Sequence, residues 1–88
     1  MSLARIELTE QQGGRLIRLA GRWTLATTSL RATELAAEMD VAANGDGTWD
    51  CTSIEALDSA GAMLLWRGWG RTFPPVLLIR PEHRRVFE

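Results

Sequence analysis

The sequence predicts an α/β fold, with one mixed β-sheet of about four strands flanked by helices. Short apolar segments typical of strands alternate with longer segments of helical apolar spacing, and residues rich in Gly, Asn or Pro separate them. The order is β-β-α-β-α-β, followed by a truncated last helix. Because two strands joined by a helix run parallel with a right-handed crossover, the sheet is expected to mix parallel and antiparallel pairs.

The first two strands form a predicted hairpin. Residues Arg5–Thr9 alternate apolar and polar side chains, the segment Glu10–Gly14 breaks the pattern, and Arg15–Gly21 resumes it. Strand segments separated by a glycine turn are typical of a β-hairpin.

The first helix is predicted after the hydroxyl-rich segment that ends at Ser29, which suits a helix N-cap. Apolar residues then recur with helical spacing, at Ala32, Leu35, Ala36, Met39 and Ala43. The segment Asn44–Gly47 tolerates left-handed backbone and ends the helix. It is interpreted as a turn rather than a phosphate loop, and the strand Thr48–Thr52 follows.

The second helix has more apolar side chains than one sheet can cover. Asp58 or Ser59 is the predicted N-cap, and Trp66, Trp69 and Phe73 follow along one stripe. Exposed aromatic area is typical of a protein interface, although the tryptophans could instead cover the rim of the domain's own core. Residues 74–81 predict an apolar strand inside the sheet, and residues 81–88 begin the last helix.

The length of 88 residues predicts a single domain, because a chain of this size has no material for a second core. We interpret residues 1–88 as one domain, cut from the N-terminus of a longer protein. Residues 1–3 and 88 are interpreted as additions at its ends.

Composition argues against several classes of function. All ten basic residues are arginines, and with 11 acidic residues the net charge is −1, so no basic face for nucleic acid is expected. No apolar run reaches the roughly 18 residues of a membrane span, so direct membrane insertion is not expected. The single Cys51 is predicted to be a small buried residue in a reducing compartment.

No enzyme is predicted. Ser59 follows Asp58, but the only histidine, His83, lies in a charged segment and is expected to be solvated rather than to act as a base. Asp50 and Asp58 are expected at the two ends of a loop, without a substrate pocket. One Cys and one His, without ligand spacing, predict no metal site, and no cofactor is expected.

The segment Asp50–Gly61 resembles the signature of the STAS domain, the fold shared by sulfate transporters and anti-sigma factor antagonists. In that signature a strand ending D-L-S-G runs through V-x-x-I into D-S-[ST]-G. Asp50–Ser53 match the first group, Ile54 and Leu57 the apolar pair, and Asp58–Gly61 the last group. The resemblance implies a STAS-like sheet over about Arg5–Arg80, although the family usually adds another strand and helix.

In the anti-sigma factor antagonists, the serine after this aspartate accepts phosphate, and its modification controls binding to a kinase-like anti-sigma factor. The resemblance makes Ser59 a possible phosphoacceptor. Ala60 stands where the family usually has a second hydroxyl. An antagonist switched by serine phosphorylation is the alternative hypothesis.

The segment Leu57–Arg71 also resembles the STAS domain of bacterial MlaE-type permeases, which belong to ABC transporters that move phospholipid. The leading hypothesis is a non-enzymatic regulatory and assembly module, cytoplasmic and held at the inner membrane through the permease. It would bind the ATPase subunit through an interface consisting of Asp58, Ser59, Ala60, Gly61, Ala62, Met63 and Trp66.

Overall fold

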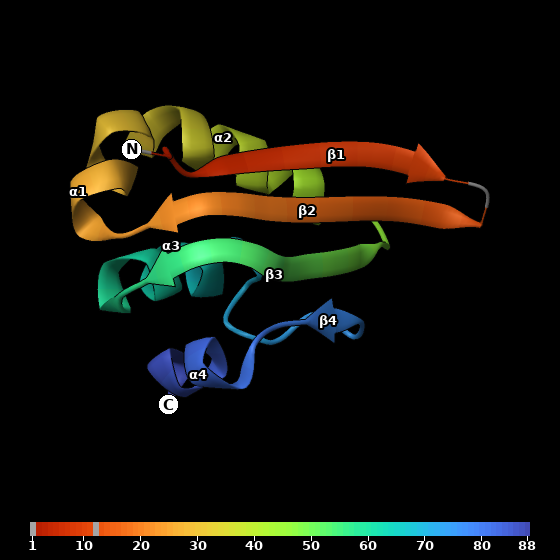
Figure 1. Ribbon diagram of the computed structural model, residues 1–88. Helices are drawn as coiled ribbons and strands as arrows, with labels where there is room; N and C mark the ends of the chain where they lie inside the picture. Colours follow the sequence, from red (N-terminus) through yellow and green to blue (C-terminus); the bar gives the residue numbers. More distant parts are fainter. Residues whose placement is uncertain (1, 12) are drawn as a thin grey trace.

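One four-stranded sheet organises the protein in the computed structural model, which describes residues 2–11 and 13–88 (Figure 1). Its strands lie in the order β1 (Arg5–Gln11), β2 (Gly14–Trp23), β3 (Thr48–Leu57) and β4 (Leu77–Leu78). The β1–β2 pair is antiparallel, whereas β2–β3 and β3–β4 are parallel. The predicted hairpin and the predicted mixed α/β sheet are therefore confirmed.

The helices lie mainly on one side of this sheet. After β2 the chain forms α1 (Leu25–Thr28), the 3₁₀ helix η1 (Ser29–Arg31) and α2 (Ala32–Ala43). Helix α3 (Ser59–Gly68) follows β3, and α4 (Pro81–Arg84) continues into the 3₁₀ helix η2 (Arg85–Phe87). Helices α2 and α3 contact each other behind the strands in Figure 1, and η2 packs against α3.

The two faces of the sheet differ in chemistry. In β2, Ile17 and Leu19 are fully buried against the helices, whereas Arg18 and Arg22 on the opposite face are exposed. The open face carries ion pairs, including Arg18 Nε–Asp50 Oδ2 at 3.6 Å. This apolar-in, polar-out alternation is what a sheet with one solvated face requires.

Strand β3 is longer than the sequence indicated. It continues through Leu57, with Cys51 and Ile54 buried, and its register against β2 shifts along the way. The expectation that Asp50 and Asp58 close the two ends of a loop is wrong, because the intervening residues pair with β2. At the rise of an extended strand, eight residues separate their Cα atoms by roughly 26 Å.

Strand β4 lies at an edge of the sheet, so the prediction of an interior strand is wrong. It has two residues, Leu77 and Leu78, and Leu78 is 49% exposed. Prolines on both sides, at positions 74, 75 and 81, limit the length over which backbone N–H groups can enter a ladder.

The buried stripe of α2 differs from the predicted one. Leu35 and Met39 are buried as expected, but Ala42 completes the stripe. The predicted members Ala32, Ala36 and Ala43 are exposed. The two large side chains set which face of the helix meets the core, because they bury far more area than an alanine does.

The tryptophans after β3 belong to an aromatic cluster. Trp69 is buried, with its ring 5.7 Å from that of Trp49 and 5.6 Å from that of Phe87. The ring of Trp66 lies 5.1 Å from that of Phe73. Such distances are typical of favourable aromatic pairs, so the tryptophans serve the domain's own core.

His83 is buried, which corrects the expectation that it is solvated. It lies in α4, which leads into η2, and η2 packs against α3. Its Nδ1 atom has no hydrogen-bond partner among the described residues. The charged residues around it in the sequence suggested a surface position, but only the packing of the chain end decides which of them is covered.

Candidate functional site

Asp58 connects the starts of two helices. It is the N-cap of α3, where its Oδ1 accepts a hydrogen bond from the Gly61 backbone N–H at 3.0 Å. Its Oδ2 accepts a hydrogen bond from the backbone N–H of Leu25, the first residue of α1, at 2.9 Å. Both helices begin at the same end of the sheet, at the left of Figure 1. One carboxylate therefore satisfies an otherwise unpaired N–H at each helix start.

Gly61 allows the first turn of α3 to approach the end of β2 closely. A Cβ atom at this position would lie 1.9 Å from the carbonyl oxygen of Trp23. The same carbonyl accepts a hydrogen bond from the Asp58 backbone N–H at 3.3 Å. The final glycine of the D-S-A-G segment is thus required by backbone contact.

The environment of Asp58 favours its charged form. Partial burial raises the pKa of this carboxyl, but the backbone N–H groups of Gly61, Leu25, Ala60 and Asp58 together lower it by more, so the pKa lies below its ordinary value of 3.8. The positive ends of both helix dipoles act in the same direction. Asp58 is therefore a charged structural cap at neutral pH.

Asp50 has a different role at the far end of β3. Its Oδ1 accepts hydrogen bonds from the Thr52 hydroxyl at 2.6 Å and from the Thr52 backbone N–H at 3.0 Å. The Thr52 hydroxyl is the main cause that lowers the pKa of Asp50, and Arg18 contributes further. Asp50 is held within the open face of the sheet and does not approach Asp58.

Ser59 is the first residue of α3 and is exposed. Of the two predicted N-caps, the structure selects Asp58, and Ser59 lies one position inside the helix. Its hydroxyl makes no hydrogen bond to any described residue, and Ala60 beside it is half-buried. Ser59 is thus accessible without having a structural task.

The remaining predicted interface residues divide between the core and the surface. Gly61 and Ala62 are buried, and Ala62 is only 4% exposed. Trp66 is half-buried against Phe73. Met63 is 53% exposed. The structure therefore brings the predicted segment together as one helix start, of which Met63 and Ser59 are the outward-facing part.

Met63 lies between two shallow grooves. One groove, of about 210 Å³, is lined by Ser59, Ala62, Met63, Trp66, Val86 and Phe87. The other, of about 270 Å³, lies between α1 and α3 and is lined by Leu25, Thr28, Ser29, Ala32, Ala60, Met63, Leu64 and Arg67. We refer to Met63 and these two grooves as the α3 face.

Sequence reasoning missed the contribution of the segment after β2. Leu25 is 64% exposed and lines a groove of the α3 face, and Leu30 in η1 is 67% exposed. The sequence contains a weak signal for this, since two leucines flank a run of hydroxyl residues. Nothing in the sequence shows that Asp58 holds this segment against α3.

The chemically reactive side chains singled out in the sequence make no hydrogen bond to one another among the described residues. Ser59 has no base in hydrogen-bonding contact, and His83 is buried in α4. Burial is the main cause that raises the pKa of the Cys51 thiol to about 12, which makes it a poor nucleophile. Within residues 2–11 and 13–88, no cluster of His, Cys, Asp or Glu could hold a metal ion.

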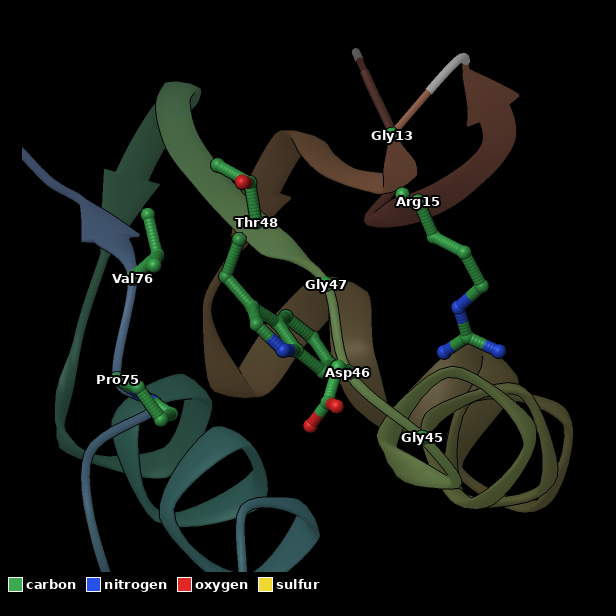
Figure 2. A pocket seen from close by; sticks show the side chains of 10 residues that line it. Gly13, Arg15, Gly45, Asp46, Gly47, Thr48, Pro75 and Val76 are labelled. Atoms are coloured by element: carbon green, nitrogen blue, oxygen red, sulfur yellow. The ribbon is translucent and has the colours of Figure 1, made fainter.

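A larger pocket, of about 360 Å³, lies at the opposite end of β3 from Asp58 (Figure 2). Gly13 from the hairpin turn and Gly45 from the turn after α2 line it, both with positive φ angles. The Arg15 guanidinium donates hydrogen bonds to the carbonyls of Ala42 and Asn44, at the end of α2. Asn44 is the C-cap of α2, and the segment Asn44–Gly47 ends this helix as predicted.

No model of a known protein family matches the chain, and no curated protein sequence matches it either. Among the described residues, no helix combines the length and the apolar character that crossing a membrane requires.

Proposed function

We propose that this chain is a non-enzymatic STAS-type regulatory and assembly module of an MlaE-type ABC transporter for phospholipid, and that it binds the ATPase subunit through the α3 face. The observation that carries the proposal is the exposed Met63 between two apolar grooves. In this proposal the domain is cytoplasmic and is held at the inner membrane through the permease.

The construction of the α3 face supports a binding role. Asp58 fixes α1 and α3 to each other, so the grooves on either side of Met63 have a defined shape before a partner arrives. A preorganised surface loses less conformational entropy on binding. An exposed apolar side chain surrounded by grooves can act as an anchor that becomes desolvated in the complex.

The resemblance of Asp50–Gly61 to the STAS signature supplies the class of partner. The four-stranded mixed sheet is compatible with that resemblance, and the D-S-A-G segment forms a strand-to-helix junction. Within this segment, Ser59 does not support the junction and is exposed, which suits a surface that contacts a partner.

The test is the substitution Met63→Glu, with binding to the cognate ATPase subunit measured by calorimetry. We expect at least about a tenfold loss of affinity, because a carboxylate would be desolvated against an apolar partner. The matched control is Val41→Glu, another exposed apolar helix residue, at 62% exposure on α2. Circular dichroism should show both variants folded. Equal affinities for Met63→Glu and the wild-type chain would contradict the proposal.

The exposure of Ser59 favours a second candidate, an anti-sigma factor antagonist switched by serine phosphorylation. A phosphate there would add negative charge at a helix N-terminus, where it is favourable, and would change the surface read by a kinase-like anti-sigma factor. Incubation with the cognate kinase and ATP, followed by mass spectrometry, should then place one phosphate on Ser59 and none on the Ser59→Ala variant. An unmodified Ser59 would exclude this candidate.

A further inference from the structure

The charge of the chain is divided unevenly along its length. Residues 59–88 contain five arginines and two glutamates, which gives a net charge of +3. Residues 1–58 contain five arginines and nine acidic residues, which gives −4. The overall charge of −1 hides a basic C-terminal part, and that part includes α3, α4 and η2.

Four of these arginines, in α3 and in the segments that follow it, are exposed, and one of them lines a groove of the α3 face. Arg67 lines the groove between α1 and α3, and Arg71 follows α3 with its backbone N–H donating to the carbonyl of Trp66. The Arg84 guanidinium lies 4.6 Å from the centre of the Phe73 ring, and Arg85 precedes Val86, which lines the other groove.

These four arginines differ from three of the five arginines in the first part of the chain, which have carboxylate partners. Arg5, Arg18 and Arg31 each form an ion pair with a carboxylate. None of the ion pairs among the described residues involves an arginine after position 58. Arg67 on the α3 face and the arginines of α4 and η2 therefore have no carboxylate partner within the described part of the chain.

We propose that the partner surface that fits the α3 face is acidic: an apolar side chain enters beside Met63, and carboxylates around it pair with Arg67 and Arg85. This inference rests on the proposed function, and it adds that the ATPase surface bound by the domain is acidic. Arginine suits the role because its planar fork binds a carboxylate through two hydrogen bonds.

The occupant is a protein rather than an anionic lipid surface. The two grooves, of about 210 and 270 Å³, have the size to take individual side chains. Glu82 and Glu88 lie in the same segment as the arginines, so the charge is mixed rather than uniformly positive. Individual pairing with carboxylates tolerates this mixture, whereas general attraction to an anionic membrane is weakened by it.

The test compares the double variant Arg67→Glu/Arg85→Glu with Arg22→Glu, a control on the open face of the sheet where Arg22 is exposed and forms none of the described ion pairs. Binding of the full chain to the ATPase subunit is measured from low to high NaCl. We expect the double variant to bind about tenfold more weakly at low salt, with a flatter salt dependence, and the control to bind like the wild type.

The outcomes separate this inference from the proposed function. If Met63→Glu weakens binding but the double arginine variant does not, the acidic partner surface is wrong and the proposed function stands. If the wild-type chain does not bind the ATPase at all, both are wrong. Sedimentation of the wild-type chain with phosphatidylglycerol vesicles, lost in the double variant while ATPase binding is retained, would overturn the inference in favour of a lipid surface.

Discussion

The two ends of helix α3 use apolar side chains in opposite ways. At its start, Asp58 caps the helix, Gly61 contacts β2, and Met63 is exposed between two grooves. At its end, Trp69 is buried in an aromatic cluster with Trp49 and Phe87. One end therefore leaves an apolar side chain exposed, and the other completes the core.

The difference shows that the largest apolar side chains of the segment are not its most exposed ones. By sequence, the tryptophans allowed two interpretations, a protein interface or a cover over the rim of the domain's own core. In the structure the chain after α3 returns and covers them with Phe73 and Phe87. Met63 and Leu25, which are smaller and less conspicuous in the sequence, remain exposed, and the half-buried Trp66 lines a groove beside Met63.

The largest expected effect tests the core end. Trp69→Ala should reduce the free energy of unfolding by about 3–5 kcal/mol, because it removes a large buried ring and leaves a cavity between Trp49 and Phe87. Urea denaturation followed by circular dichroism measures the loss. Met63→Ala at the other end of α3 is the control and should cost far less. Similar losses for the two variants would remove the contrast between the ends.

Gly61→Ala tests the close contact at the start of α3. The added methyl group would meet the Trp23 carbonyl, so helix and strand must separate, at a cost of about 1–3 kcal/mol. Ala60→Ser adds an atom one residue earlier, where the side chain is half-buried, and should be tolerated better. A thermal melt of both variants is sufficient. A Gly61→Ala variant as stable as the wild type would show that the helix start adapts.

Asp58→Ala removes the carboxylate that joins α1 to α3 and should cost about 1–2 kcal/mol, the upper part of the range for a lost N-cap. The pH dependence sharpens this test. Since the folded-state pKa of Asp58 lies below 3.8, its contribution is fully present above the unfolded pKa and is lost as pH falls through the folded pKa.

Asp58→Asn should therefore show less loss of stability on acidification than the wild type, measured by urea midpoints over the acid range. Asp50→Asn is the matched comparison, since the pKa of Asp50 is also lowered but by Thr52 at the other end of β3. An unchanged acid dependence in Asp58→Asn would mean that its carboxylate is not held as described.

The smallest expected effect is that of Ser59→Ala. Because Ser59 is exposed and Asp58 is the cap, the stability should change by no more than about 0.5 kcal/mol. The measurement is a urea titration beside Asp58→Ala. A loss comparable to that of Asp58→Ala would mean that both residues cap the helix.

Much of the fold could be predicted from local pattern. The alternation around Arg5–Thr9 and Arg15–Gly21, the helical spacing of Leu35 and Met39, and the breaks at glycine turns all correspond to observed elements. These features depend on neighbours in the sequence, so periodicity reveals them. The sequence did not reveal the full length of β3. Its polar residues Thr52, Ser53 and Glu55 lie on the solvated face and interrupt the apolar pattern that would indicate a strand.

The sequence by itself determined the α/β class, the order of the elements and a helix start in the segment Asp58–Gly61. Only the tertiary structure decided that one carboxylate caps both α1 and α3, that Trp69 is buried, and that Met63 is exposed. The physical reason is that burial and hydrogen bonding between Leu25 and Asp58, or between Trp69 and Phe87, depend on how distant segments pack. Local periodicity carries no information about that packing.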